Sequence, residues 1–170
     1  TIVASGENSS KPHAIPTDRK IQNVDIITID MGCKINGYCS DMTRTIFVGQ
    51  VPEYVKPVYE LVLKNQKQVL QDMKENANTK QIAKMVDNDF KLNNYDLIHA
   101  LGHGVGLEIH EGPVLSINSE NILRENMVVT NEPGIYIPGQ FGVRIEDTVL
   151  ITKGGCETLT KSNKNYVIVK

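Results

Sequence analysis

The sequence predicts an α+β fold, because strand-like and helix-like patterns occupy separate stretches of the chain. Near the N-terminus, Asn36-Gly37 lies between apolar, β-branched segments, and this dipeptide readily takes the positive φ angles of a two-residue hairpin turn. Apolar residues then recur at helical spacing from residue 53 to residue 90. Beyond residue 100, short apolar runs broken by glycine and proline predict a second set of strands.

Length and composition predict one globular domain over residues 1–170. Hydrophobic residues make up 40% of the chain and charged residues 22%, as in ordinary globular proteins. The formal net charge of −2 provides no basic surface, so nucleic acid is not an expected partner. No apolar run reaches the roughly 20 residues of a membrane span, so no membrane association is expected. Cys33, Cys39 and Cys156 lack C-x-x-C spacing and are expected to be reduced thiols of a cytoplasmic protein.

The predicted hairpin places two aspartates on one face. Pairing around Asn36-Gly37 sets Asp41 opposite Gly32, and Asp30 lies two residues further along, on the same side of the sheet. Side chains in such diagonal positions lie about 7–8 Å apart or less, so the carboxylates of Asp30 and Asp41 can flank a cation. The alternative is that this face is exposed and both aspartates are solvated.

The segments around the hairpin are assigned no chemistry of their own. Thr1–Gly6 is predicted to be a strand and residues 7–24 a loop, whose isolated His13 would ordinarily be a surface residue. One helix is predicted between residues 53 and 77, and a second begins near Thr79, capped by Asn78 or by Thr79 itself. Both helices are expected to cover the core with Val55, Val58, Tyr59, Val62, Val69, Met73, Ile82, Ala83, Val86 and Phe90.

Three of the four histidines fall within residues 99–110, a segment rich in glycine. Glycines at 102, 104 and 106 argue against a helix, where each costs about 1 kcal/mol relative to alanine. The segment lacks the third glycine and the strand-to-helix context of a dinucleotide-binding loop, so that function is rejected. His103 and His110 are seven residues apart, and a regular strand would send them to opposite faces and different roles. The alternative is that these histidines are satisfied core residues.

Two further carboxylates stand at strand ends in the C-terminal part of the chain. Glu132 follows an apolar run, and Pro133-Gly134 then turns the chain. Alternation over residues 143–147 places Arg144 and Glu146 on one face of a strand. The alternatives are a turn carboxylate for Glu132 and a surface ion pair for Arg144 and Glu146. Residues 166–169 are predicted to form a final strand.

Five of these residues form a hard, oxygen-rich set of donors. One imidazole and four carboxylates suit Mn²⁺, Co²⁺, Fe²⁺ or Zn²⁺ better than a thiolate site would. Four carboxylates also neutralise two divalent ions, which together can lower the pKa of a water molecule and polarise a carbonyl group. The set is Asp30, Asp41, His103, Glu132 and Glu146.

Five segments, in this order, resemble the catalytic domain of the pita-bread metallopeptidases, in the branch of aminopeptidase P and Xaa-Pro dipeptidase. The resemblance covers essentially the whole chain. It implies the pita-bread (creatinase/aminopeptidase) fold, which is a curved, mostly antiparallel sheet backed by helices. The segments are Ile29–Cys33, Ser40–Thr45, Gly102–Gly106 with His110-Glu111, Asn131–Tyr136 and Val143–Asp147.

The resemblance also implies roles for individual residues. All members of the oxygen-rich set would ligate two divalent metal ions, with Mn²⁺ the expected metal and Co²⁺, Zn²⁺ or Fe²⁺ the alternatives. Asp41 and Glu146 would bridge the ions, and Glu132 would also act as the general base. The other implied catalytic residues are His13 and His110, which match histidines that contact substrate and stabilise the tetrahedral intermediate, His99, and Arg144, which would lie beside the bridging carboxylate.

The implied activity is hydrolysis of the bond between an N-terminal residue and proline, in a peptide with proline in second position. The residues around Glu132 and Arg144 resemble Xaa-Pro peptidases more than methionyl aminopeptidases. Methionyl aminopeptidases share the fold and the ligands, so they stay open as an alternative. A catalytically inert binding module of the same fold is the second alternative.

Two departures from the family pattern carry expectations. Phe141 stands where relatives often have glycine, and this bulky residue is expected near the site, where it would reshape the substrate pocket. The family's first helix pair and a further N-terminal domain have no counterpart before Thr1, so residues 1–170 are expected to be a partial catalytic domain. The sheet face that the missing pair would cover is expected to be exposed, or covered by a second copy in a homodimer.

Overall fold

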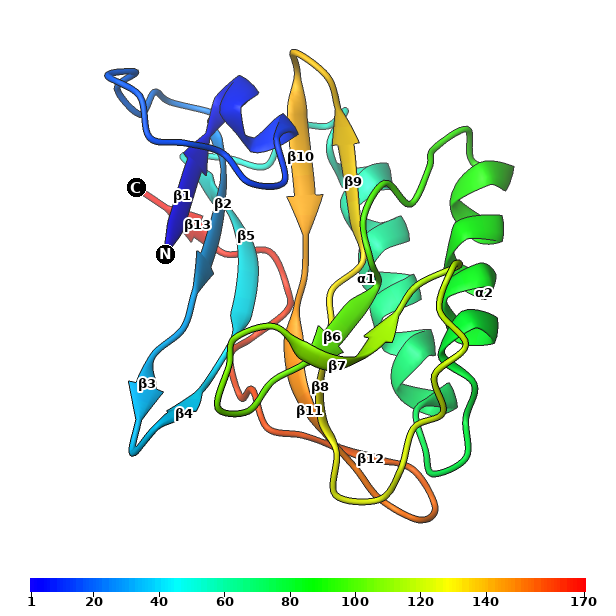
Figure 1. Cartoon of the computed structure of the whole chain (residues 1–170). Coiled ribbons are helices and arrows are strands. Elements are labelled where there is room, and N and C mark those ends of the chain that lie inside the picture. Colours follow the sequence, from blue (N-terminus) through cyan, green and yellow to red (C-terminus); the bar gives the residue numbers. More distant parts are fainter.

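The computed structural model describes residues 1–170 and confirms the α+β class, with strands before and after two α-helices (Figure 1). The helices are α1 (Lys56–Asp72) and α2 (Thr79–Leu92), and a short 3₁₀ helix spans Gly6–Ser10. The strands are β1 (Ile2–Ser5), β2 (Ile26–Met31), β3 (Lys34–Ile35), β4 (Tyr38–Cys39), β5 (Met42–Val48), β6 (Gly102–Gly104), β7 (Glu111–Leu115), β8 (Val128–Asn131), β9 (Gly134–Ile137), β10 (Phe141–Arg144), β11 (Asp147–Ile151), β12 (Cys156–Thr158) and β13 (Ile168–Val169).

The N-terminal sheet has the strand order β1-β2-β5-β13, and its hairpin has the predicted register. Asp30 lies opposite Thr43 and Lys34 opposite Cys39, so one register runs from β2 and β5 out to the β3–β4 tip. The turn residues Asn36 and Gly37 have φ angles of 51° and 88°, as a two-residue hairpin turn requires. The final strand, β13, pairs with β5 in parallel and is shorter than predicted.

The C-terminal part contributes a second sheet, with the order β12-β11-β8-β6-β7, and the separate β9–β10 hairpin. Strand β10 lies between the two parts of the chain, because it pairs with β9 and also contacts β2 and β5 (Figure 1). A hydroxyl fixes this contact: Thr45 Oγ1 on β5 accepts a hydrogen bond from the Arg144 amide at 3.1 Å. The strand ends that carry polar residues therefore meet along β10.

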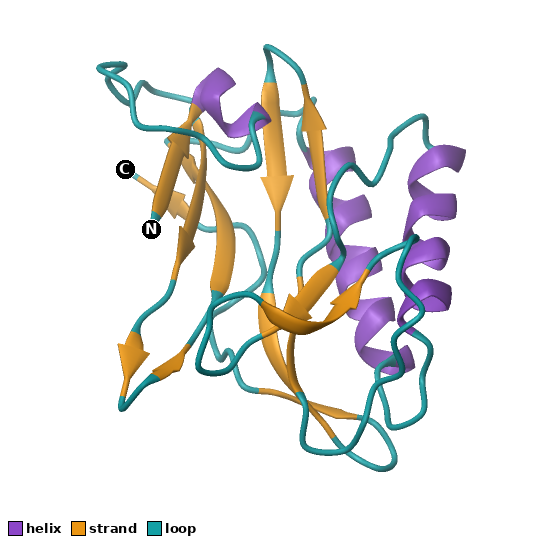
Figure 2. Ribbon diagram, in the orientation of Figure 1, coloured by secondary structure: helices purple, strands orange, loops and turns teal.

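Helices α1 and α2 pack against each other and cover one side of the strands β7–β10 (Figure 2). Every apolar residue predicted for their inner faces is buried. The α2 cap is Asn78, whose side chain accepts a hydrogen bond from the Gln81 amide at 3.1 Å. Rings from β5 and α1 also meet, since the centroids of Phe47 and Tyr59 lie 5.6 Å apart. The predicted helices and their core-facing residues are therefore confirmed, with shorter bounds for α1.

The structure corrects two sequence-based expectations. The predicted loop 7–24 begins with a 3₁₀ helix, in which the Ser9 hydroxyl donates to the Gly6 carbonyl oxygen at 2.6 Å. Phe141 does not line the candidate site: it is buried in the core, and its ring centroid lies 5.5 Å from that of Tyr54. Alternation explains this position, because Phe141 and Val143 face the core while Arg144 faces the other side of β10.

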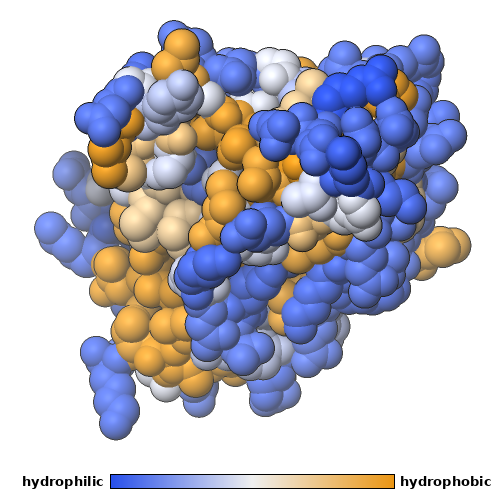
Figure 3. Space-filling model, turned by 90° about the horizontal axis from the view of Figure 1, so that it is seen from below, coloured by the Kyte–Doolittle hydropathy of each residue, from blue (hydrophilic) through white to orange (hydrophobic).

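Several large apolar side chains of the N-terminal sheet and its hairpin are exposed, and both helices lie on the far side of the molecule (Figure 2). Seen from below, hydrophobic residues gather at the left, which is the side of β1–β5 (Figure 3). The exposed apolar residues of these strands are Val3, Met31, Ile35, Tyr38, Ile168 and Val169. Neither α-helix is long and apolar enough to span a lipid bilayer.

Candidate metal centre

One cleft brings together all of the residues that were predicted to be metal ligands or catalytic residues. Its lining includes residues of β2, β6 and β10 and residues that directly precede β5 or follow β8. These strands are labelled in Figure 1. All four histidines of the chain line it. Its lining is Pro12, His13, Asp30, Asp41, His99, Ala100, His103, His110, Glu132, Arg144 and Glu146.

The hairpin register delivers Asp30 and Asp41 to the cleft. Asp30 pairs with Thr43, which lies two residues beyond Asp41, so the two carboxylates fall on the same face. The side chains of Asp30 and Asp41 are only 24% and 11% exposed, so neither is freely solvated, as the alternative would require. Ligand atoms of the two aspartates and of Glu146 all lie within 4.8 Å of one another.

His103 lies in the middle of β6, and Glu132 directly follows the neighbouring strand β8. The His103 amide donates to Thr130 Oγ1 at 3.0 Å, and the same hydroxyl donates to Glu132 Oε1 at 3.0 Å. His103 Nε2 then lies 3.2 Å from Glu132 Oε1 and 3.7 Å from Asp41 Oδ2. Gly102 permits this close pairing, since a Cβ atom there would stand 2.1 Å from the Thr130 carbonyl oxygen.

Glu146 is held in the gap between β10 and β11. Its amide donates to the Thr43 carbonyl oxygen at 3.1 Å, and this contact is an isolated β-bridge between Glu146 and β5. The Thr43 hydroxyl donates in turn to Glu146 Oε2 at 2.6 Å. The side chain is buried, so Glu146 is the least accessible carboxylate of the five predicted ligands.

The five predicted ligands fall into overlapping groups whose donor atoms lie within 4.8 Å of one another. Glu146 belongs to one group with Asp30 and Asp41, and to another with His103 and Glu132. Asp41 and His103 form a third group with His110. Carboxylate and imidazole donors suit a hard or borderline divalent cation. Because neighbouring groups share members, the arrangement fits two adjacent ions better than two separate sites.

Arg144 lies in the wall of the cleft and pairs with Asp30, and it does not form the surface ion pair with Glu146 that was the alternative. It is buried, and its Nη2 donates to Asp30 Oδ2 at 2.8 Å. Its Nη1 donates to the Tyr136 hydroxyl at 2.7 Å, which lies 3.0 Å from His99 Nε2. A hydrogen-bonded row therefore connects His99, Tyr136, Arg144 and Asp30.

Tyr136, Thr43 and Thr130 were given no role from the sequence, although each contacts a predicted site residue. For two of them, the spacing in the sequence could have predicted a place at the site. Thr43 is two residues from Asp41, and Thr130 is two residues from Glu132, so strand alternation puts each hydroxyl on the same face as the carboxylate. Tyr136 lies on the next strand and carries no such signal.

The relation of His103 to His110 differs from the expectation. The two rings meet edge to face, with their centroids 4.4 Å apart, and both line the cleft. The segment between them is not a regular strand, because β6 ends at Gly104 and the chain folds back into β7 at Glu111. His110 and His13 lie at the mouth of the cleft and are more accessible than the half-buried His103.

Burial and mutual repulsion set the electrostatics of the cleft. Burial and then the neighbouring Asp30 raise the pKa of Asp41 to about 6. Burial and then the nearby Glu132 raise the pKa of Glu146 well above its ordinary value. Burial also raises the pKa of Glu132, but the hydrogen bond with His103 and the nearby cationic groups outweigh burial. The pKa of Glu132 is therefore lowered. The cleft therefore holds more negative charge than its own cations compensate, as metal sites do.

The metal-free chain is expected to lose stability as pH rises from about 4.5 towards 7. Carboxyl groups with a raised folded pKa, here Asp41 and Glu146, stabilise the folded state while protonated and lose that contribution as pH passes their folded pKa. The pKa of His103 is also raised, because the Glu132 hydrogen bond and other nearby acceptors outweigh burial, and it acts in the same direction. Urea unfolding in EDTA at a series of pH values measures this. Stability that rises between about pH 5 and pH 7 would contradict it.

The comparisons with known proteins decide the family. The model of metallopeptidase family M24 matches residues 1–153. This chain belongs to metallopeptidase family M24. An Xaa-Pro dipeptidase of Pyrococcus furiosus is 47% identical to this M24 chain in an alignment 170 residues long, which covers 98% of the chain and 49% of that protein.

Solved structures agree with this M24 assignment and confirm the pita-bread fold implied by the resemblance. An X-Pro aminopeptidase of Thermotoga maritima superposes with a TM-score of 0.95 at 39% identity, over 99% of this chain and 48% of that one. Prolidase from Pyrococcus furiosus superposes with a TM-score of 0.92 at 47% identity, over 95% of this chain and 49% of that one. The M24 chain therefore spans about half the length of these relatives.

Proposed function

We propose that residues 1–170 form part of the catalytic domain of a metal-dependent peptidase that hydrolyses the bond between an N-terminal residue and proline. The observation that carries this proposal is the convergence of one imidazole and four carboxylates in one cleft of an M24 chain. The names of its relatives, Xaa-Pro dipeptidase and X-Pro aminopeptidase, support proline as the second residue of the peptide substrate.

In this proposal Asp30, Asp41, His103, Glu132 and Glu146 hold two divalent ions. Asp41 and Glu146 would bridge them, because these are the two carboxylates that belong to two of the overlapping donor groups and each has two oxygens to share. Mn²⁺ is the proposed metal, since four carboxylates make the set rich in hard oxygen donors. When bound, two such ions lower the pKa of a water molecule and polarise the scissile carbonyl group.

The remaining residues of the cleft then have distinct proposed roles. Glu132 accepts the proton of the attacking water, and its lowered pKa keeps it ionised for that purpose. His110 and His13, at the mouth, donate hydrogen bonds to the substrate and to the tetrahedral intermediate. Arg144 fixes the Asp30 carboxylate, and the Tyr136 hydroxyl joins Arg144 to His99. The free thiols Cys33, Cys39 and Cys156 suit a reducing compartment, for which we propose the cytoplasm.

The test combines metal content with paired substrates. Chelator-treated chain is titrated with Mn²⁺, and about two ions per chain are expected. The loaded chain is then given Met-Pro, Met-Pro-Ala and Met-Ala, which share the N-terminal residue and differ in the residues after it. Faster cleavage of the two proline peptides supports the proposal. Preference for Met-Ala would support a methionyl aminopeptidase instead, and a chain that binds no Mn²⁺ would support an inert binding module.

A further inference from the structure

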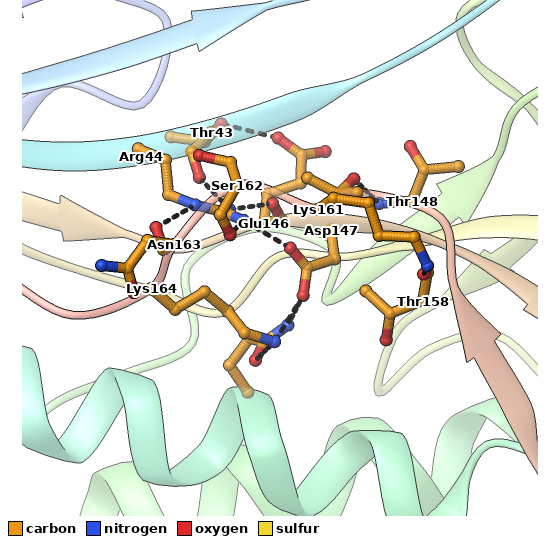
Figure 4. Close-up of polar contacts among 12 residues, drawn as sticks. Thr43, Arg44, Glu146, Asp147, Thr148, Thr158, Lys161, Ser162, Asn163 and Lys164 are labelled. Carbon is orange, nitrogen blue, oxygen red and sulfur yellow. Dashed lines mark hydrogen bonds and ion pairs between the residues drawn. The ribbon is translucent and has the colours of Figure 1, made fainter.

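Behind the cleft, four side chains from four parts of the chain form a buried polar group, the Asp147 cluster. Asp147 of β11 is fully buried and accepts hydrogen bonds from Arg44 of β5 at 2.7 Å, Gln66 of α1 at 2.7 Å and Lys164 at 2.6 Å. Figure 4 shows the carboxylates of Glu146 and Asp147 on opposite sides of the backbone, the first towards β5 and the second towards α1. The cluster therefore adjoins the predicted bridging ligand without lining the cleft.

Arg44 is the member that joins this cluster to the candidate metal centre. All five guanidinium N–H groups are used, which is the full donor capacity of the side chain. Because the guanidinium is planar and rigid, five simultaneous bonds fix its position and that of its acceptors. The acceptors are the main-chain oxygens of Thr43, Glu146, Ser162 and Asn163 and the carboxylate of Asp147.

The main chain of Glu146 depends on β5 for its hydrogen bonds. Residue 146 belongs neither to β10, which ends at Arg144, nor to β11, which begins at Asp147. Its amide donates to the Thr43 carbonyl oxygen, and its own carbonyl oxygen accepts from Arg44. The guanidinium in turn donates to the carbonyl oxygens of Ser162 and Asn163, in the C-terminal part of the chain. The next residue, Lys164, donates to Asp147.

We propose that Arg44, fixed by Asp147 and by the segment Ser162–Lys164, is a positioning residue for the Glu146 carboxylate. This inference rests on the proposed function, in which Glu146 bridges two metal ions. A bridging carboxylate binds both ions only if its main chain is held still, and removing the groups behind a ligand commonly weakens metal binding by about 10- to 100-fold. The C-terminal segment thus contributes to metal affinity although it contacts no ligand side chain.

The test is Arg44→Lys, which keeps the positive charge but removes the planar guanidinium and its five N–H donors. The matched control is Arg124→Lys, since Arg124 is exposed and its Nη1 contacts only Asn76. Mn²⁺ titration of chelator-treated protein, well below the unfolding temperature, should show at least about tenfold weaker binding for Arg44→Lys and no change for the control. Amide hydrogen exchange at Glu146 in the metal-free chain should also be faster in Arg44→Lys alone.

A second variant keeps the inference testable if Arg44→Lys does not fold. Lys164→Met removes the 2.6 Å ion pair with Asp147 and leaves the five Arg44 donors in place, so its Mn²⁺ affinity should lie between those of wild type and Arg44→Lys. A folded Arg44→Lys or Lys164→Met chain with the affinity of wild type would overturn the inference while leaving the proposed function standing. Wild-type chain that binds no Mn²⁺ would overturn both.

Discussion

Glu146→Gln is expected to abolish tight binding of the second metal ion and, with it, peptide cleavage, while raising the unfolding temperature of the metal-free chain. Loss of a direct ligand should exceed the effect of losing an outer partner, which weakens metal binding by about 10- to 100-fold. Burial and the nearby Glu132 raise the pKa of Glu146, so above that pKa the ionised side chain destabilises the metal-free fold. The glutamine oxygen can still accept the hydrogen bond of Thr43.

Glu146→Gln should weaken metal binding and at the same time stabilise the metal-free chain, so the two effects can be told apart. Thermal unfolding in EDTA measures the stability of the metal-free chain, and the further rise of the midpoint in Mn²⁺ measures metal binding. Each kcal/mol of stability regained should raise the metal-free midpoint by about 2–4 °C in a chain of this size. Glu157→Gln, at an exposed position of β12, is the matched control and should change neither quantity. A metal-free Glu146→Gln chain that unfolds at a lower temperature than wild type would show that the carboxylate is not destabilising there.

Local patterns account for the part of the site that could be predicted from the sequence. The Asn36-Gly37 turn fixes the register of two strands, and that register alone brings Asp30 beside Asp41. Alternation likewise separates Glu146 from Asp147, which the structure places on opposite sides of the chain. Turn type and side-chain period are both short-range properties, so they can be recognised without knowing how distant segments pack.

The features that could not be predicted depend on contacts between distant segments. The Asp147 cluster joins residues 98 or more positions apart in two of its contacts, and no sequence period relates Lys164 to Gln66 or Asp147 to Arg44. His110 returns to His103 because the chain folds back after an irregular β6, which spacing alone does not reveal. The expected position of Phe141 was wrong for a different reason: it rested on relatives that often have glycine there, and not on the side of the strand that alternation assigns to the residue.

Asp147→Ala is expected to be among the most destabilising single substitutions in this chain. The Asp147 side chain is fully buried and is paired with Arg44, whose side chain is 6% exposed, and with Lys164, whose side chain is 21% exposed. Removing one partner of a buried ion pair leaves uncompensated charge and costs about 3–5 kcal/mol. For a chain of this length the midpoint of thermal unfolding should fall by roughly 10 °C.

The control for this substitution is Glu120→Ala, which breaks an ion pair with Lys80 and removes a carboxylate whose side chain is 74% exposed. Its effect should be much smaller, because solvent screens exposed charges and such pairs contribute little. Equal losses in the two variants would show that burial does not strengthen the Asp147 cluster. If Asp147→Ala is strongly destabilised while Arg44→Lys stays folded and binds Mn²⁺ weakly, Asp147 stabilises the fold and Arg44 transmits that rigidity to Glu146. One buried carboxylate would then support both the polar link between α1 and β11, through Gln66, and the geometry of the candidate metal centre on the other side of the strand.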